Sequence, residues 1–282
     1  MNIIAIGEVL WDIFSKGKRL GGAPANFAFY CNELGQNAYL VSAVGDDDLG
    51  KELLQNIPIC SELIAVNSKP TGRINVQLKN GIPTYSIHEK VAWDYMELND
   101  SLKTQLSKSK AICFGSLAQR NAKSKKTIHR VLDKAPDGCL KVFDVNLRQN
   151  YYSKKALEES LKKTNLLKIN DEELEILSTL FGISGSEIER AKTLMKTYGV
   201  ESLALTKGTS GSYFLRGKEI DYQPIIKTIV KDTVGAGDAF LAGLVSGLLT
   251  GLSINAAHKQ ACKVSSFVCA QNGAMNPLKN IN

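Results

Sequence analysis

The feature that most constrains the fold is an alternation of short apolar runs with amphipathic helical patterns along most of the 282 residues. Strands that are apolar along their whole length are buried on both faces, and intervening helices make neighbouring strands parallel. We therefore expect an α/β fold whose mainly parallel central sheet is covered on both faces. The expected strands are residues 3–7, 38–44, 111–115, 142–146, 166–170 and 203–207, and the expected helices include residues 25–34, 49–56, 124–134, 154–164 and 186–198.

Two segments depart from this alternation. Residues 12–20 and 73–88 alternate polar and apolar side chains with a period of two, and Asn80-Gly81 in the second segment is a hairpin-turn pattern. They predict a small β-flap inserted at about residues 12–20 and 70–95, which closes over a ligand as a lid or forms an ordinary edge hairpin. Because no long linker divides the chain, we expect a single domain over residues 1–282.

Composition excludes several functional classes. The chain has 35 Lys and Arg against 28 Asp and Glu, and the net charge of +7 is spread over helical patterns with no nucleic-acid recognition motif. Solvated helix faces explain this charge, with attraction of an anionic substrate as the alternative. Because no recognition motif accompanies the charge, we expect no nucleic-acid partner. The six cysteines form no CxxC pair and the three histidines are widely separated, so we expect no zinc site.

The N-terminus and the longest uncharged stretch bear on location. The segment MNIIAIGEVLWD has no basic region, and Gly7 and Glu8 interrupt its apolar part, so we expect no signal peptide. Residues 239–257 carry no charge but contain glycines, serines and a threonine, so a buried helix pair divided near Gly251 explains them better than a membrane span. We expect a soluble, cytoplasmic protein with reduced cysteines and no membrane partner.

Two common nucleotide-binding motifs are incomplete. After the first expected strand, Gly7 stands alone where a dinucleotide site needs three glycines. The segment GDDDLGK from Gly45 imitates a Walker A loop, but Glu52 stands where Ser or Thr must hold magnesium, and its three aspartates would repel phosphates. These patterns argue against a dehydrogenase and against a P-loop enzyme.

A glycine-rich segment, KDTVGAGDAF at residues 231–240, precedes a long apolar helical pattern. Gly235, Ala236 and Gly237 leave backbone N–H groups unencumbered at the helix N-terminus, and these groups with the helix dipole predict an anion site. Asp238 falls in the first turn, where its carboxylate can take a proton from an attacking hydroxyl as charge builds on a phosphoryl group. The alternative is an acidic residue that only complements the helix dipole.

A second glycine-rich segment, GGAPAN, begins at Gly21. Pro24 suits the first turn of a helix, and the paired glycines allow a ligand to approach the backbone closely. Asn26, one turn further, offers a donor and an acceptor, which suits sugar hydroxyls.

Both segments resemble the signatures of the PfkB, or ribokinase-like, carbohydrate kinases. The first reads GGxPxNxA from Gly21, followed by Gly35 and Gly45, and the second reads DTVGAGD from Asp232. The resemblance implies a ribokinase-like three-layer sandwich with a lid, and an enzyme that uses ATP and Mg²⁺ to phosphorylate a small sugar. It also implies that Asp238 is the catalytic base and that the anion hole for the transferred phosphoryl group is formed by Gly235, Ala236 and Gly237.

The resemblance extends to the nucleotide side. The implied ATP-binding residues are Asn170, Glu173, Thr206, Gly208, Gly211 and Asn272. Asn170 and Glu173 match an NxxE motif that orders magnesium through water, although a capping Asn with first-turn acids is the alternative. Asp232 occupies the position where several relatives bind a monovalent cation, and Gly273 adds a carbonyl, so a requirement for K⁺ stays open.

On the sugar side, the implied substrate-binding residues are Asp12, Gly21, Gly22, Asn26 and Arg148. Arg148 ends a DxNxR segment that is similar to fructokinase-type members, and its fixed charge suits a phosphoryl group or a substrate anion. Tyr85 and Trp93 belong to the flap region and either stack on the substrate or serve the structure.

The combination of GEVLWDIF, RLGGAPANFA, FGSLAQR and FDVNLR is most similar to fructokinases, which transfer the γ-phosphoryl group of ATP to the 6-hydroxyl of D-fructose. The alternatives are another small acceptor, such as ribose or 2-keto-3-deoxygluconate, and a non-catalytic protein that binds a sugar or a nucleotide. Some relatives dimerise through the lid, so a homodimer through its exposed strand edges is a further expectation.

Overall fold

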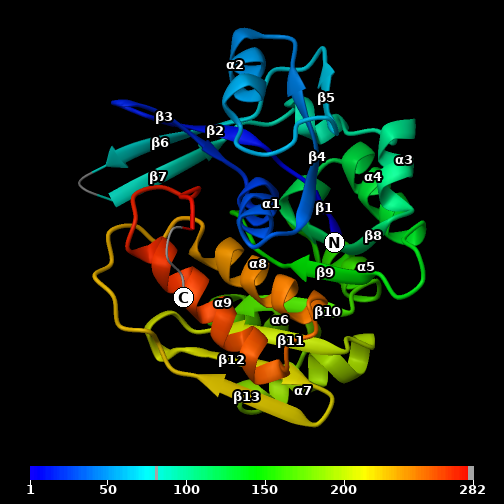
Figure 1. The fold of residues 1–282 in the computed structure, drawn as a ribbon, viewed down its shortest axis with the longest axis vertical. Coiled ribbons are helices and arrows are strands. Elements are labelled where there is room, and N and C mark those ends of the chain that lie inside the picture. Colours follow the sequence, from blue (N-terminus) through cyan, green and yellow to red (C-terminus); the bar gives the residue numbers. More distant parts are fainter. Residues whose placement is uncertain (80–81, 279–282) are drawn as a thin grey trace.

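The computed structural model describes residues 1–79 and 82–278, and a nine-stranded sheet lies at its centre (Figure 1). Its strands are β1 (Asn2–Ile6), β4 (Asn37–Gly45), β5 (Ile64–Asn67), β8 (Ser109–Gly115), β9 (Leu140–Asp144), β10 (Leu166–Asn170), β11 (Ser202–Thr206), β12 (Ser212–Arg216) and β13 (Glu219–Gln223). They lie in the order β13-β12-β11-β10-β9-β8-β1-β4-β5. Every neighbouring pair from β11 to β5 is parallel, whereas β12 and β13 are added antiparallel at one edge.

Helices cover both faces of this sheet. They are α1 (Ala23–Glu33), α2 (Asp48–Asn56), α3 (Asp100–Leu106), α4 (Ala122–Asp133), α5 (Lys154–Leu161), α6 (Asp171–Phe181), α7 (Glu187–Tyr198), α8 (Ala236–Leu249) and α9 (Ile254–Cys269). One buried cluster joins the sheet to α3, α4, α5, α6 and α7, and a second joins it to α1, α2, α8 and α9. The expected three-layer α/β architecture is therefore confirmed.

The central strand β1 shows why its sequence is apolar throughout. Ile4 and Ile6 pack in the first cluster, whereas Ile3 and Ala5 pack in the second, and all four are fully buried. A strand with helices on both faces has no solvent-facing side, so polar residues are excluded from it. The six strands expected from such runs are all present within a few residues of their expected bounds.

A second sheet of four strands stands off the first, and we call it the lid. It consists of β2 (Leu10–Phe14), β3 (Gly17–Gly21), β6 (Arg73–Lys79) and β7 (Ile82–Ile87), in the order β3-β2-β6-β7. The segment expected as one alternating run at residues 12–20 is two strands, because the chain turns between Phe14 and Gly17. The expected turn at Asn80-Gly81 lies outside the described residues, although β6 and β7 do pair antiparallel.

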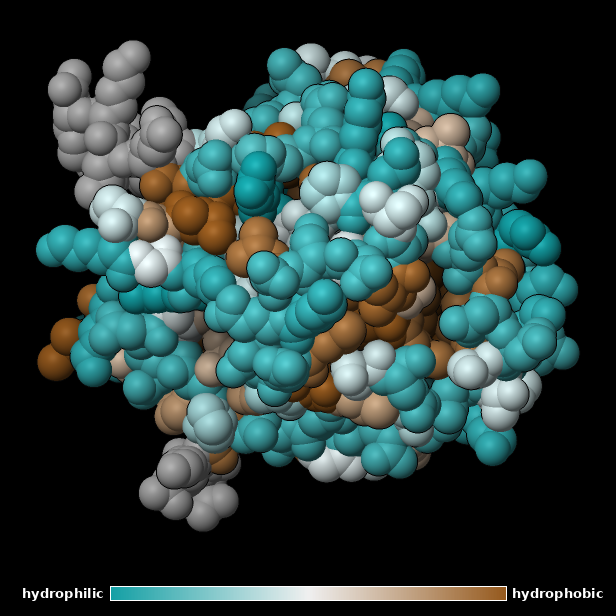
Figure 2. All heavy atoms as spheres, turned by 90° about the horizontal axis from the view of Figure 1, so that it is seen from above, coloured by the Kyte–Doolittle hydropathy of each residue, from teal (hydrophilic) through white to brown (hydrophobic). Residues whose placement is uncertain are grey.

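The expected break near Gly251 is confirmed. Gly251 has a φ of 83° between α8 and α9, in the left-handed region that favours glycine. None of the helices in residues 1–79 and 82–278 combines the length and apolar character needed to cross a bilayer. On the face shown in Figure 2, hydrophilic atoms dominate and apolar atoms form separate patches.

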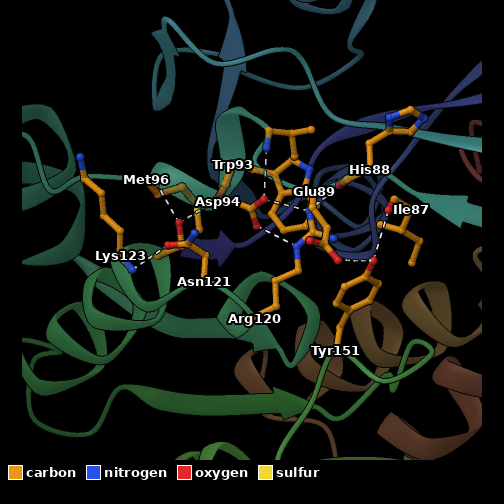
Figure 3. A network of polar contacts seen from close by, with 12 residues as sticks. Ile87, His88, Glu89, Trp93, Asp94, Met96, Arg120, Asn121, Lys123 and Tyr151 are labelled. Carbon is orange, nitrogen blue, oxygen red and sulfur yellow. Dashed lines mark hydrogen bonds and ion pairs between the residues drawn. The ribbon is translucent and has the colours of Figure 1, made fainter.

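A buried ion pair fixes the chain where it returns from the lid to the body (Figure 3). Arg120 Nε and Nη2 donate to the two carboxylate oxygens of Asp94 at 2.8 and 2.9 Å, and Nη2 also donates to the His88 carbonyl at 2.6 Å. The guanidinium carbon lies 4.0 Å from the ring centroid of Trp93, which is 1% exposed. Trp93 therefore has the structural role, and it anchors the base of the lid.

Candidate active site

A cavity of about 1370 Å³ lies between the lid and the carboxyl ends of the parallel strands. Parallel sheets bind ligands at this end, because loops and helix N-termini converge there. The cavity brings together most residues expected at the sugar and phosphoryl sites, namely Asp12, Gly21, Gly22, Asn26, Arg148, Asp232, Gly235, Gly237 and Asp238. Two sequence motifs that are far apart along the chain thus meet in one site.

Asp238 lies in the first turn of α8 and is 9% exposed. Asn26 Nδ2, from α1, donates a hydrogen bond to Asp238 Oδ2 at 2.7 Å. Burial and the neighbouring Asp144 carboxylate raise the pKa of Asp238 to about 6, although Asn26, Lys168 and Arg148 act in the opposite direction. A carboxyl group with this pKa is ionised at neutral pH and remains a useful proton acceptor.

The N-terminus of α8 has the backbone geometry of an anion site. Gly235 has a φ of 80°, and a Cβ there would approach Ala274 Cβ to 2.8 Å, so only glycine fits. A Cβ on Gly237 would lie 3.0 Å from Lys168 Nζ, which places that ammonium group beside the helix N-terminus. Ala236 begins the helix and does not line the cavity, and its N–H group donates to the Thr233 carbonyl at 3.2 Å.

Lys168 is a site residue that the sequence analysis missed. Its ammonium group donates to Asp144 Oδ1 at 2.9 Å, and the side chain is 8% exposed. Burial alone lowers the pKa of Lys168, but the carboxylates of Asp144, Glu173 and Asp238 raise it above its usual value, so the group stays charged. The sequence did contain a signal for this role: a lysine stands inside the apolar strand LLKIN, and a charge buried there requires a partner.

Glu8 is a second missed residue. It follows β1, lines the cavity and is 4% exposed. Burial raises its pKa to about 7, and the charges that act on it come from Arg148, Asp238 and Asp144. The sequence feature that could have identified Glu8 is an isolated acidic residue directly after a buried strand.

The glycine pair is explained by contacts within the chain itself. A Cβ on Gly21 would lie 2.5 Å from Asp12 Oδ2, and a Cβ on Gly22, whose φ is 115°, would lie 2.4 Å from the Glu8 carbonyl oxygen. Burial raises the pKa of Asp12 to about 6, against the effects of Arg148 and Arg19. The glycines thus allow two carboxyl-bearing segments to pack against the floor of the cavity.

The lid wall is more exposed than the body wall. Tyr85 lines the cavity with 54% of its surface accessible, so of the two flap aromatics it is the one that faces the cavity.

Arg148 is exposed and its Nη1 donates to the Leu147 carbonyl at 3.5 Å. Its neighbours Asn146 and Gln149 have φ values of 40° and 49°, which are uncommon for residues other than glycine.

None of the expected nucleotide-binding residues lines the cavity. They are Asn170, Glu173, Thr206, Gly208, Gly211 and Asn272. Asn170 and Thr206 are register partners at the carboxyl ends of β10 and β11. Asn170 and Glu173 form a reciprocal capping box on α6, as the structural alternative anticipated. The second Glu173 oxygen accepts from Leu147 N at 2.9 Å.

Asp232 contacts both the body and the lid. Its two carboxylate oxygens accept hydrogen bonds from Val234 N and Gly273 N, each at 3.0 Å. Arg19 Nη1, on the lid strand β3, lies 3.5 Å from Asp232 Oδ2. The Gly273 carbonyl accepts from Asn276 Nδ2 at 2.7 Å. Within residues 1–79 and 82–278, no three His, Cys, Asp or Glu side chains cluster as a ready metal site.

Comparisons with known proteins agree with this geometry. A curated relative, sugar kinase PH1459 of Pyrococcus horikoshii, is 31% identical over 96% of this chain and 91% of its own length. The crystal structure of that protein, an uncharacterized sugar kinase, in complex with ATP is 30% identical and superposes with a TM-score of 0.84, covering 97% of this chain and 94% of the other. A fructokinase of Rhizobium leguminosarum bv. trifolii is 25% identical over 87% of this chain and 79% of its own length.

The fold also matches a fructokinase double mutant from Vibrio cholerae, in a form with bound fructose, ADP and a potassium ion. That structure is 20% identical and has a TM-score of 0.82, covering 98% of this chain and 94% of the other. The family model described as pfkB family carbohydrate kinase matches residues 7–281. The chain therefore belongs to the pfkB family of carbohydrate kinases and is a phosphotransferase with a sugar as acceptor.

Proposed function

We propose that this enzyme transfers the γ-phosphoryl group of ATP to the 6-hydroxyl of D-fructose. The observation that carries the mechanism is the buried Asp238, held by Asn26 at the N-terminus of α8 inside the cavity. The fructokinase relative from Rhizobium leguminosarum supports fructose as the acceptor. The lid is proposed to cover the ligand. The lid and the body together are proposed to form one kinase domain.

In this proposal Asp238 is the general base. Its carboxylate takes the proton of the acceptor hydroxyl while that oxygen bonds to the γ-phosphorus. The bond from the γ-phosphorus to the bridging oxygen breaks, and ADP leaves with the electron pair. The N–H groups of Gly235 and Gly237, which line the cavity, are proposed to stabilise the developing charge, and Lys168 adds a fixed positive charge beside them. Ala236 would join this anion hole only if its N–H group gave up its hydrogen bond to the Thr233 carbonyl.

The sugar is proposed to lie on the floor formed by Gly21 and Gly22. Asp12 accepts sugar hydroxyls, and Asn26 joins this contact to the base, because its amide already donates to Asp238. Arg148 lines the cavity and is proposed to bind the phosphoryl group or an acidic substituent on the acceptor. These roles follow from the chemistry of the side chains that line the cavity.

ATP is proposed to bind along the carboxyl ends of β10 and β11, next to Asn170, Thr206, Gly208 and Gly211, with its adenine near Asn272. Mg²⁺ would neutralise phosphate charge there. Glu173 fits a contact through water, since both its oxygens already accept backbone hydrogen bonds.

A monovalent cation, K⁺ in the fructokinase from Vibrio cholerae, would act here through Asp232. Its carboxylate is available only in part, because two backbone N–H groups and Arg19 already lie against it. Assays in K⁺ and in a bulky organic cation decide whether the site is used: equal rates in both would remove the proposal.

The lid also offers an assembly surface. Its outer strands β3 and β7 leave unpaired edges among the described residues, and a second copy of the chain could pair there. We therefore propose a homodimer through the lid. Sedimentation showing only monomer at the concentrations used for assay would contradict it.

The substrate is tested by ADP release in the presence of ATP and Mg²⁺, with Asp238→Ala as the control. The acceptors are D-fructose, ribose, glucose, adenosine and 2-keto-3-deoxygluconate, together with fructose 6-phosphate because Arg19 and Arg148 line the cavity. We expect fructose to have the highest kcat/KM and the variant to be inactive. A different best acceptor would overturn fructose alone, whereas no turnover at all would favour a binding protein.

A further inference from the structure

Two oxygen atoms in the wall of the cavity are buried and have no hydrogen-bond partner among the described residues. They are Glu8 Oε2 and Asn26 Oδ1. Both residues are 4% exposed and line the cavity that contains Asp238. A buried polar atom without a partner carries an energetic cost, so such atoms in a binding site usually meet a ligand. Both atoms are acceptors, and the hydroxyl groups of a sugar are donors.

The position of Glu8 favours contact with a ligand over a purely structural role. It follows β1, a strand in the interior of the parallel sheet, at the end where such sheets bind their ligands. Its backbone is held in place, because Gly22 packs against the Glu8 carbonyl so closely that a Cβ would lie 2.4 Å away. No salt bridge to its carboxylate occurs within residues 1–79 and 82–278. A carboxyl group buried for stability alone is normally paired.

We propose that Glu8 determines substrate specificity: its carboxyl group accepts a hydrogen bond from a sugar hydroxyl other than the one that Asp238 deprotonates. The inference rests on the proposed binding of the acceptor in this cavity. Asp12 and Glu8 then bind different hydroxyls, while Asn26 lines the same cavity and donates to Asp238. An acceptor that lacks the hydroxyl facing Glu8 would leave a buried carboxylate unpaired, which is the strongest way for a site to reject it.

The ionisation of Glu8 gives the proposal a second readout. Burial raises its pKa to about 7, the Glu8 backbone N–H and Arg148 oppose the shift, and Asp238 and Asp144 reinforce it. The ionised carboxylate is the better acceptor. We therefore expect affinity for the acceptor to increase as the pH rises through about 7, and we expect Glu8→Gln to remove this dependence.

The experiment compares wild type with Glu8→Gln on the best acceptor of the panel and on its monodeoxy analogues. We expect Glu8→Gln to lower kcat/KM for the intact sugar by roughly 10- to 100-fold, mainly through KM, which is the range for a hydrogen bond to a charged group. With wild type, the analogue that lacks the hydroxyl facing Glu8 should lose kcat/KM by the same factor. Glu8→Gln should not lower the kcat/KM of that analogue any further. Equal losses on every analogue, or no loss on the intact sugar, would overturn the proposal.

Two controls keep a loss of structure or of activity from obscuring the result. Glu219→Gln, on the exposed end of β13, removes a carboxylate far from the site and should leave kcat/KM unchanged. Glu8→Gln should unfold at or above the wild-type temperature at pH 8, and a lower midpoint would instead make Glu8 structural. If wild type phosphorylates no sugar, calorimetry with D-fructose alone decides: weaker binding by Glu8→Gln upholds the inference while the proposed activity fails, and no binding by wild type removes both.

Discussion

The two walls of the cavity differ in how they are built. The body wall carries Asp238 and Lys168 on elements of the central sheet and its helices, and both side chains are almost fully buried. The lid wall carries Tyr85 and Phe14, which are 54% and 38% exposed, on a four-stranded sheet. Phosphoryl transfer requires charges fixed in place, whereas a cover must admit and release the sugar. We therefore expect changes in the body wall to affect the rate, and changes in the lid wall to affect acceptor binding.

The largest expected effect tests the body wall. Asp238→Asn should lower kcat by about 10²- to 10⁴-fold, the usual contribution of a general base. The acceptor should still bind, because the amide keeps the shape of the carboxyl group and Asn26 remains in place. Steady-state kinetics with the best acceptor measure both quantities, and a variant that retains more than a tenth of wild-type kcat would show that Asp238 is not the base.

The pKa of Asp238 supplies a matching control. Because burial raises this pKa to about 6, the wild-type rate should increase with pH through about 6 as the base ionises. The native state favours the protonated carboxyl group, so this residue stabilises the fold at low pH and loses that contribution as the pH rises from about 4 through about 6. Asp238→Asn should therefore be at least as stable as wild type at pH 7, which separates its loss of activity from unfolding.

The next largest effect tests the anchor of the lid. Arg120→Met leaves the Asp94 carboxylate buried and unpaired, and we expect it to lower the free energy of unfolding by about 3–5 kcal/mol. The matched control is Lys162→Met, because Lys162 pairs with Glu158 at 2.7 Å on an exposed helix face. That variant should cost less than about 1 kcal/mol. Similar urea midpoints for the two variants would refute the anchoring role of Arg120.

A pair of glycines compares the two regions directly. Gly22 and Gly17 both have positive φ values, but a Cβ on Gly22 would collide with the Glu8 carbonyl whereas a Cβ on Gly17 would meet no atom within 4 Å. Gly17→Ala in the lid should cost about 1 kcal/mol for backbone strain alone. Gly22→Ala should cost about 2 kcal/mol or more and should also weaken acceptor binding, because the floor must move. Chemical denaturation and KM measurements compare the two variants. Equal effects of Gly17→Ala and Gly22→Ala would show that the floor of the cavity is not rigid.

The body was predictable from the sequence because its signals are local and strong. Apolar runs such as residues 3–7 can be buried only between two helical layers, and the family resemblance carried by the two glycine-rich segments implied that Asn26 and Asp238 share a site. Their hydrogen bond joins residues 212 positions apart. Glu8 and Lys168 were missed because a charged residue at the end of a strand, or inside one, shows its role only when its neighbours from other strands are known.

The lid was less predictable, for a topological reason. A period-two pattern identifies strands but leaves their partners open, and β2 pairs antiparallel with β3 and parallel with β6. The turn between β2 and β3 gave no glycine or asparagine signal at its centre, since Ser15 and Lys16 occupy it. For Trp93, the sequence left open both stacking on the substrate and a structural role, and the position of Arg120 over its ring decides for the structural role.

The smallest effect tests whether the lid contributes affinity without contributing to the chemistry. Tyr85 is half exposed, lines the cavity from β7 and packs in neither of the two buried clusters. Tyr85→Ala should therefore leave the free energy of unfolding within about 0.5 kcal/mol of wild type, as expected for a surface substitution. It removes an aromatic face that can stack on the sugar, so KM should rise by less than about 10-fold while kcat stays constant. Tyr85→Phe, which keeps the ring, should restore KM. A fall in kcat would mean instead that the lid helps to align the acceptor hydroxyl with Asp238, and the division between the two walls would then fail.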